Sequence, residues 1–174
     1  IALSLVGSEM CIRDRRMRVM SERVFIAGGA GFSGDRFDAA VPLVAHLASC
    51  DGARYLIFEV LAERTIALAQ ISKTVDPDLG YSPYLEAYLR PVLEQIKMHH
   101  IKVVSNMGAA NPLAAAKHIN KLADELGLPP FRIAVLSGDD LSTYLDEKTL
   151  LEAPTMEGNQ LSGRDLKAAN VYLG

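Results

Sequence analysis

The glycine-rich stretch Gly28–Asp35 follows the apolar run Val24–Ala27 directly and constrains the fold more than any other feature of the sequence. An apolar run that breaks into such a loop predicts a buried strand, a turn and then a helix. Glycine lets the backbone approach a ligand closely, and the N–H groups that open a helix can hold an anion. We therefore expect a ligand-binding loop. Its candidate residues are Gly28, Gly29, Gly31, Ser33, Gly34 and Asp35.

Two later apolar runs end in the same way. Val103 and Val104 lead into a polar loop that ends at Pro112, and the run 133–136 leads into Ser137–Asp140. Strands that alternate with helical patterns predict an α/β fold with a mainly parallel, doubly wound (Rossmann-like) sheet and flanking helices. Such sheets bind ligands at the carboxyl ends of their strands. The expected strands are 24–27, 55–61, 101–105 and 132–136; the expected helices are 37–48, 63–73, 84–99 with a kink at Pro91, 112–126 and 144–151; a turn is expected at 157–161.

Carboxylates fall at or just past the ends of these expected strands, so the fold should gather them along one edge. Clustered carboxylates hold a divalent cation or raise one another's pKa for acid–base chemistry. Asp35, Asp139 and Asp140 also suit helix N-caps, and Glu63 suits the first turn of a helix. Glu59 has no capping role within its apolar strand, which makes it the strongest candidate. The candidate catalytic residues are Glu59, Glu63, Asp139 and Asp140, and the candidate metal ligands are Asp139 and Asp140.

The loop after Val104 supplies the remaining candidate ligand-binding residues, Asn106, Gly108 and Asn111. The amide of Asn106 is placed to hold a carbonyl or carboxylate oxygen. Asn111 has a second interpretation as the N-cap of a helix that begins at Pro112.

A nicotinamide-binding interpretation is also open. Gly29, Gly31 and Gly34 have the spacing of a dinucleotide fingerprint, and Glu59 is near the position of its acidic residue. Tyr144 and Lys148 even have the spacing of a short-chain dehydrogenase pair. However, Asp35 places a negative charge where the phosphate would bind. We therefore keep NAD(P) as the less favoured cofactor, after a divalent cation.

Composition limits the class of protein. A net charge of −3 without a basic stripe argues against nucleic-acid binding, and no apolar stretch reaches the roughly 20 residues that span a bilayer. Two cysteines form no disulfide framework, so a cytoplasmic protein is expected. Residues 1–16 resemble translated sequencing-adapter DNA. We accordingly expect 1–19 to be an artefactual or disordered leader, and 20–174 to be the N-terminal part of a domain truncated at its C-terminus.

Several segments in order resemble the acyclic terpene utilisation (AtuA-like) family, formerly a domain of unknown function. The loop 107–110 departs from the usual family pattern at Met107 and Ala109, but its residues stay small or flexible. The segments that carry the resemblance are 29–35, 55–63, 78–81, 104–112, 137–141 and 169–174.

The resemblance implies a bacterial cytosolic protein of acyclic terpenoid or branched-acid breakdown, which proceeds through acyl-CoA intermediates. We expect an enzyme that acts on a branched acyl-CoA or related carbonyl compound by hydratase, lyase or isomerase chemistry. Two alternatives stay open: an NAD(P)-dependent oxidoreductase, and a non-catalytic ligand-binding subunit of a catabolic complex. Either a homo-oligomer or such a complex is the expected assembly.

Overall fold

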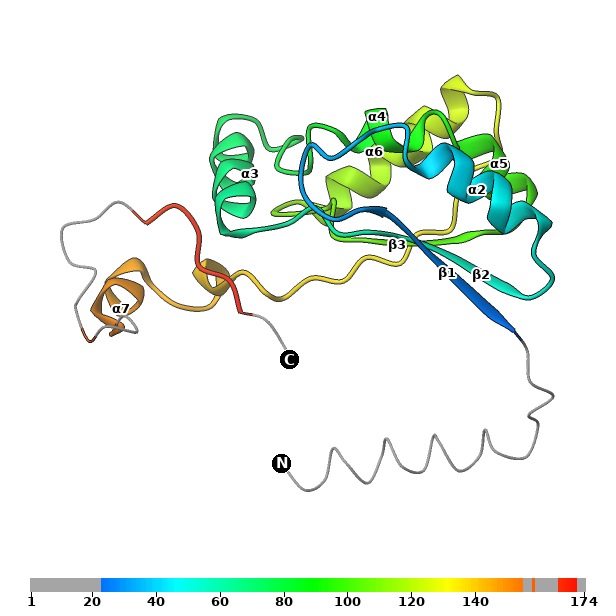
Figure 1. The fold of residues 1–174 in the computed structure, drawn as a ribbon. Coiled ribbons are helices and arrows are strands. Elements are labelled where there is room, and N and C mark those ends of the chain that lie inside the picture. Colours follow the sequence, from blue (N-terminus) through cyan, green and yellow to red (C-terminus); the bar gives the residue numbers. More distant parts are fainter. Residues whose placement is uncertain (1–22, 155–157, 159–165, 172–174) are drawn as a thin grey trace, which may run out of the picture.

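The computed structural model describes residues 23–154, 158 and 166–171. It contains a parallel sheet of three strands in the order β1 (Val24–Ala30), β2 (Ala53–Phe58) and β3 (Lys102–Ser105). Figure 1 shows helices above one face of this sheet. The expected α/β class with a parallel sheet is confirmed. The helices over the sheet are α2 (Ala40–Ser49), α4 (Leu85–Leu89), α5 (Leu93–Met98) and α6 (Pro112–Glu125).

The strand order explains why the helices share one face. Both crossovers move across the sheet in the same direction, and right-handed crossovers that do so place their helices on the same side. Helix α3 (Glu63–Val75) lies beyond the carboxyl ends of the strands, and α7 (Glu147–Glu152) lies away from the sheet (Figure 1). The doubly wound, Rossmann-like form is therefore not confirmed for the described residues.

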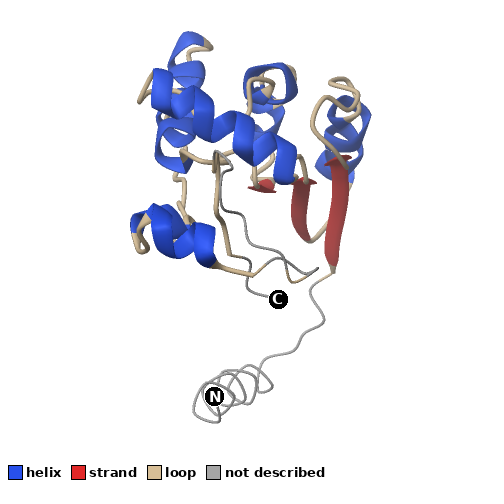
Figure 2. Ribbon diagram, turned by 90° about the vertical axis from the view of Figure 1, so that its left-hand side faces the viewer, coloured by secondary structure: helices blue, strands red, loops and turns tan. Residues whose placement is uncertain are grey.

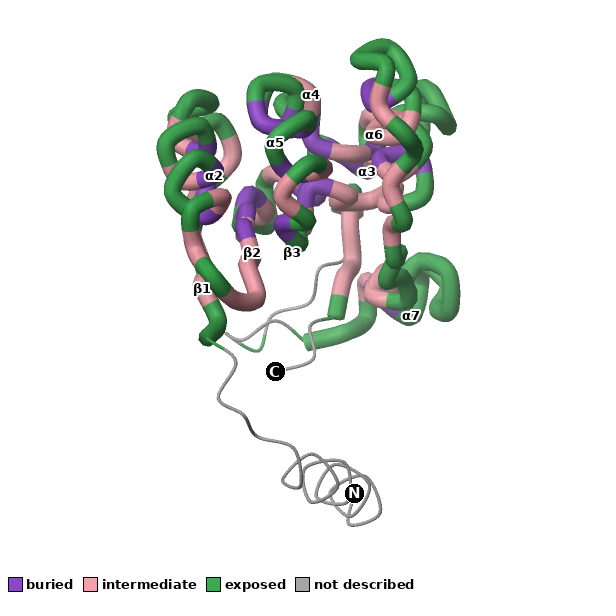
Figure 3. Tube along the Cα trace, turned by 90° about the vertical axis from the view of Figure 1, so that its right-hand side faces the viewer, coloured by how far each residue is buried: buried purple, intermediate pink, exposed green. Residues whose placement is uncertain are grey.

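The core lies between the sheet and the helices, as Figures 2 and 3 show from opposite sides. Leu56 and Phe58 alternate along β2 with residues of the other face, and both are fully buried under the helical layer. The ring of Phe58 lies 5.6 Å from that of Tyr88 in α4, and the Tyr88 ring lies 5.0 Å from that of Phe37. This aromatic chain fixes the helical layer to the sheet and to the segment after the glycine loop.

Local signals explain the start and end of α6. Asn111 accepts a hydrogen bond from the N–H of Ala114 at 3.3 Å, so it is the N-cap, and Pro112 is the first helical residue. Gly127 then adopts a φ of +67°, a conformation that glycine reaches without strain.

Two expected elements differ from the structure. The helix expected over 84–99 is divided into α4 and α5, because Pro91 has no N–H to donate and its ring crowds the preceding turn. Residues 132–136 form no strand. At the start of this segment the N–H of Phe131 donates to Asn120 Oδ1 at 2.7 Å, whereas Leu136 at its end is 89% exposed. The turn expected at 157–161 lies outside the described residues, except for Gly158.

Gly29 makes the packing of β1 against β2 testable. A Cβ at this position would lie 2.5 Å from the ring of Phe58, which is buried and has no room to move away. We expect Gly29→Ala to lower the free energy of unfolding by about 1–3 kcal/mol, the usual penalty for overpacking a core. Gly28→Ala is the matched control, since nothing lies within 4 Å of a Cβ there. Equal urea midpoints for the two variants would contradict this account.

Candidate functional site

The glycine loop closes on itself. The carboxylate of Asp35 accepts hydrogen bonds from the N–H of Gly31 at 3.1 Å and from the N–H of Arg36 at 2.8 Å. The hydroxyl of Tyr88 donates to the backbone oxygen of Asp35 at 3.1 Å. Asp35 thus caps the loop itself. The sequence suggested that it caps the following helix, and this expectation is wrong because α2 begins only at Ala40.

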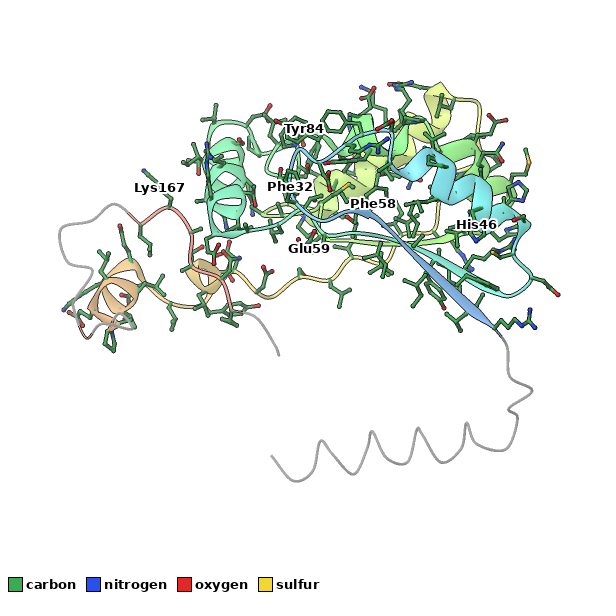
Figure 4. The ribbon with its side chains drawn as sticks, viewed as in Figure 1. Phe32, His46, Phe58, Glu59, Tyr84 and Lys167 are labelled. Atoms are coloured by element: carbon green, nitrogen blue, oxygen red, sulfur yellow. The ribbon has the colours of Figure 1, made fainter. Side chains whose placement is uncertain are left out.

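This geometry bears on anion binding by the loop. The N–H of Gly31, which a dinucleotide phosphate would need, already has an acidic partner inside the chain. Gly29 lacks a side chain because Phe58 occupies the space, and Gly34 adopts a φ of +84°. Ser33 is half-buried, whereas Phe32 at the loop tip is 61% exposed (Figure 4). Packing therefore explains Gly29 and backbone conformation explains Gly34, whereas a Cβ on Gly28 or Gly31 would meet open space.

Glu59 lies immediately after β2, and Asn106 fixes its carboxylate. The Oδ1 of Asn106 accepts from the N–H of Val60 at 2.8 Å, so its amide nitrogen must point the other way, where it donates to Glu59 Oε1 at 2.8 Å. The same oxygen accepts from the N–H of Leu61 at 3.2 Å. Glu59 is exposed, and Figure 4 shows it at the level of the sheet, away from the helical layer that carries Tyr84. One carboxylate oxygen is thus held while Oε2 accepts no hydrogen bond from the described residues.

The rest of this second loop is structural in its contacts. Asn111 donates from Nδ2 to the backbone oxygens of Pro77 and Leu79, at 2.8 and 2.7 Å, so it fixes the preceding loop as well as capping α6. A Cβ on Gly108 would lie 2.6 Å from that of Pro112. Asn106 and Asn111 therefore use their amides within the protein, and no further observation supports Asn111 or Gly108 as a ligand contact.

Asp139 and Asp140 contact a segment near the end of the chain. Asp139 Oδ2 accepts from Asn170 Nδ2 at 2.9 Å, and the backbone of Asp140 forms an isolated antiparallel bridge with Asn170. Asp140 also accepts from Gln70 Nε2 of α3 at 2.7 Å and from the N–H and hydroxyl of Ser142. Partial burial raises the pKa of the Asp140 carboxyl, but these hydrogen bonds and the charge of Lys73 outweigh it, so that its pKa lies below the ordinary value.

The structure does not gather the four carboxylates into one cluster. Among the residues that it describes, no group of three or more His, Cys, Asp or Glu side chains could hold a metal ion. Asp139 and Asp140 were expected at a strand end, but the strand before them does not form. Glu63 is the first residue of α3, where its charge complements the helix N-terminus. Only Glu59 combines a strand end, exposure and a fixed orientation.

Sequence reasoning missed several residues that organise this region. Gln70 and Lys73 lie three positions apart on α3, so they share a face of the helix; Lys73 Nζ donates to the backbone oxygen of Ala110 at 2.9 Å. Their spacing was a readable signal that both side chains leave α3 on the same face. Asn170 carried no such signal, because its partners lie far away in the sequence.

The fold and the site define an α/β protein whose parallel sheet presents one exposed, amide-held carboxylate beyond its central strand. The chain matches the family described as "Acyclic terpene utilisation family protein AtuA" over residues 24–174, and it belongs to that family. No curated protein and no solved structure gives a significant match. Within the described part of the chain, every helix is too short or too polar to cross a membrane.

Removal of the Asn106 amide tests its role as a clamp. Asn106→Ala leaves the half-buried N–H of Val60 without its partner, which should lower the free energy of unfolding by about 1–3 kcal/mol. Glu59→Gln keeps an oxygen that can accept from the same donors and should change stability far less. Urea unfolding of both variants checks this order, and an Asn106→Ala protein as stable as Glu59→Gln would show that the amide is dispensable.

Acid should weaken the contact between α3 and Asp140. A pKa that is lower in the folded than in the unfolded protein adds stability above the unfolded value, about 3.9, and loses it as the pH falls through the folded value. Wild type should therefore exceed Asp140→Asn in stability at pH 7, with a difference that shrinks as the pH falls below about 3.9 and is lost below the folded pKa. Guanidinium unfolding between pH 3 and 7 measures this, with Asp124→Asn at an exposed position of α6 as control. A difference that is constant with pH would exclude the titration of Asp140 as its source.

Proposed function

We propose that this chain belongs to an enzyme that acts on a branched acyl-CoA or related carbonyl compound, with Glu59 as its acid–base residue. One observation carries the proposal. Glu59 projects from the carboxyl end of the central strand, the usual place for ligands in parallel sheets, with Oε1 held by two donors. Both partners donate, which suits the ionised carboxylate and leaves Oε2 to accept a proton.

The family name supports the substrate class, since it connects the chain with acyclic terpene utilisation. Branched carbon skeletons of that kind are degraded as thioesters, whose carbonyl acidifies the neighbouring C–H. A positioned carboxylate suits removal or delivery of that proton, as in a hydratase, lyase or isomerase step. We keep a bacterial, cytoplasmic setting as part of the proposal.

Asp139, Asp140 and Glu63 have weaker support, because each has a structural partner or a place in a helix. An NAD(P)-dependent oxidoreductase receives no support from the loop, whose Gly31 N–H is taken by Asp35. A non-catalytic subunit is distinguished from an enzyme by the experiment below.

The first experiment is a ligand screen by thermal shift with saturated and unsaturated branched acyl-CoAs, Mg²⁺, Mn²⁺, NADH and NADPH. A ligand that binds only the folded protein raises Tm in proportion to RT ln(1 + [L]/Kd). The acyl-CoAs that bind are then incubated with the protein, and the thioesters are analysed by mass spectrometry. We expect a shift with an acyl-CoA; a shift with nicotinamide cofactors alone would contradict the proposal.

Glu59→Gln tests the assigned residue. Loss of the proposed acid–base group should reduce turnover by at least 100-fold, within the range for general acid–base catalysis, while Tm and acyl-CoA binding stay nearly unchanged. Glu94→Gln, an exposed first-turn acid of α5, is the matched control and should keep full turnover. Full activity of Glu59→Gln would remove Glu59 from the mechanism, and binding without any turnover in wild type would favour the non-catalytic subunit.

A further inference from the structure

Within the part of the chain that the structure describes, no helix covers one face of the sheet. The helices cover the face that carries Leu56 and Phe58, but the opposite face exposes apolar side chains. Val24 is 57% exposed, Ile26 is 66% exposed and Val104 is 55% exposed. Parallel sheets normally have both faces covered, and contiguous exposed apolar surface marks an interaction site. We therefore expect another polypeptide layer to pack on this face.

The register of the strands arranges this face in rows. The ladder places Gly28, Ile57 and Val104 side by side in a central row. Gly28 has open space around it, so a neighbouring surface can approach closely there. The row two residues earlier along each strand holds Ile26, Tyr55 and Lys102.

The row two residues later holds Glu59 and Asn106, which follow the ends of β2 and β3. The face thus has an apolar centre, with a side chain that carries charge at each end.

The two charges lie at matched positions about the central row. Lys102 Nζ lies 3.2 Å from the hydroxyl of Tyr55 and 5.1 Å from the centre of its ring, so the ammonium group stands over β2 and not only over β3. Glu59 follows the end of β2 directly, four residues after Tyr55, and the alternation of side chains along the strand places it on the same side. A half-turn about an axis that runs across the strands, parallel to the sheet and just outside this face at Ile57, places Glu59 of one copy opposite the Tyr55 and Lys102 position of the other.

We propose that a second copy of this chain covers the face, with its strands antiparallel to those of the first copy. In this arrangement the central rows pack on each other, and Lys102 of each copy meets the partner's Glu59. Such a contact between identical surfaces has the self-complementarity of a two-fold dimer, and aligned packing of two sheets is a common arrangement. The charge pair sets the direction of the strands, because parallel stacking would place like charges opposite each other.

The size of the face sets the expected affinity. Strands about 4.8 Å apart and residues about 3.3 Å apart give a patch of roughly 15 by 17 Å, or about 500 Å² for the two copies together, which is below the roughly 1,200 Å² of standard specific interfaces and is typical of a weak contact. We therefore expect a dimer with a Kd in the micromolar range. Dimerisation would remove the Glu59 carboxylate from bulk water, and this consequence for the site rests on the proposed function, whereas the dimer itself does not.

Sedimentation velocity of the whole chain between about 5 and 500 µM tests the proposal. Wild type should convert from monomer to dimer within this range, and Val104→Glu should stay monomeric. Lys102→Glu and Glu59→Lys should each raise Kd by at least tenfold. The double variant Lys102→Glu/Glu59→Lys restores an opposite pair at both positions and should return Kd to within about threefold of wild type. Lys117→Glu, an exposed position on α6, is the control and should leave Kd unchanged.

Two outcomes would overturn the proposal. A wild-type chain that is monomeric at every concentration would mean that a different polypeptide layer covers the face. A double variant no better than the single variants would mean that Lys102 and Glu59 do not meet. Circular dichroism and Tm confirm that each variant is folded. Since no step measures turnover, failure of the dimer and failure of the proposed function are read separately.

Discussion

The close approach of Phe58 to Gly29 is the contact on which the rest of the structure depends. The Phe58 ring fills the space of the missing side chain at Gly29, and it can therefore reach Tyr88 in the helical layer. Tyr88 in turn holds the backbone of Asp35 through its hydroxyl. The pairing of β1 with β2, the packing of the helices on the sheet and the closure of the glycine loop thus all depend on the absence of a Cβ at Gly29.

This dependence changes the meaning of a glycine-rich loop after a strand. The pattern predicted a strand, a turn and a ligand site, and the strand and the turn are present. The helix was expected to open at the loop, yet Asp35 satisfies the Gly31 N–H and the chain continues through turns to Ala40. A spacing of glycines reports where a backbone must be free of side chains. It does not report whether a phosphate or a neighbouring aromatic ring requires that freedom.

The sequence was most informative where structure is local. The Asn111–Pro112 start of α6 and the parallel strands could be predicted, because capping groups and apolar runs act over a few residues. Residues 132–136 have the composition of a strand, but a strand also needs a partner edge, and sequence composition does not show whether one pairs. The carboxylate cluster failed for the same reason, since it required that strand to deliver Asp139 and Asp140. Glu59 stays the strongest candidate because the argument for it is local: it is an acid in an apolar run without a capping role.

This sheet has two unusual features on the same side, an exposed carboxylate and an exposed apolar face. A neighbouring layer that excludes water would affect both of them. Bulk water competes for the protons that a fully solvated carboxylate would exchange, so Glu59 gains from a neighbour that excludes solvent. The apolar rows beside it gain from the same neighbour, because their exposure is unfavourable in water. Asn106 then has a clear purpose, since it keeps one oxygen of Glu59 occupied within the protein whatever layer arrives over the other. Under the two proposals, the covering of the face and the acid–base chemistry at the strand end therefore both depend on the position of Glu59.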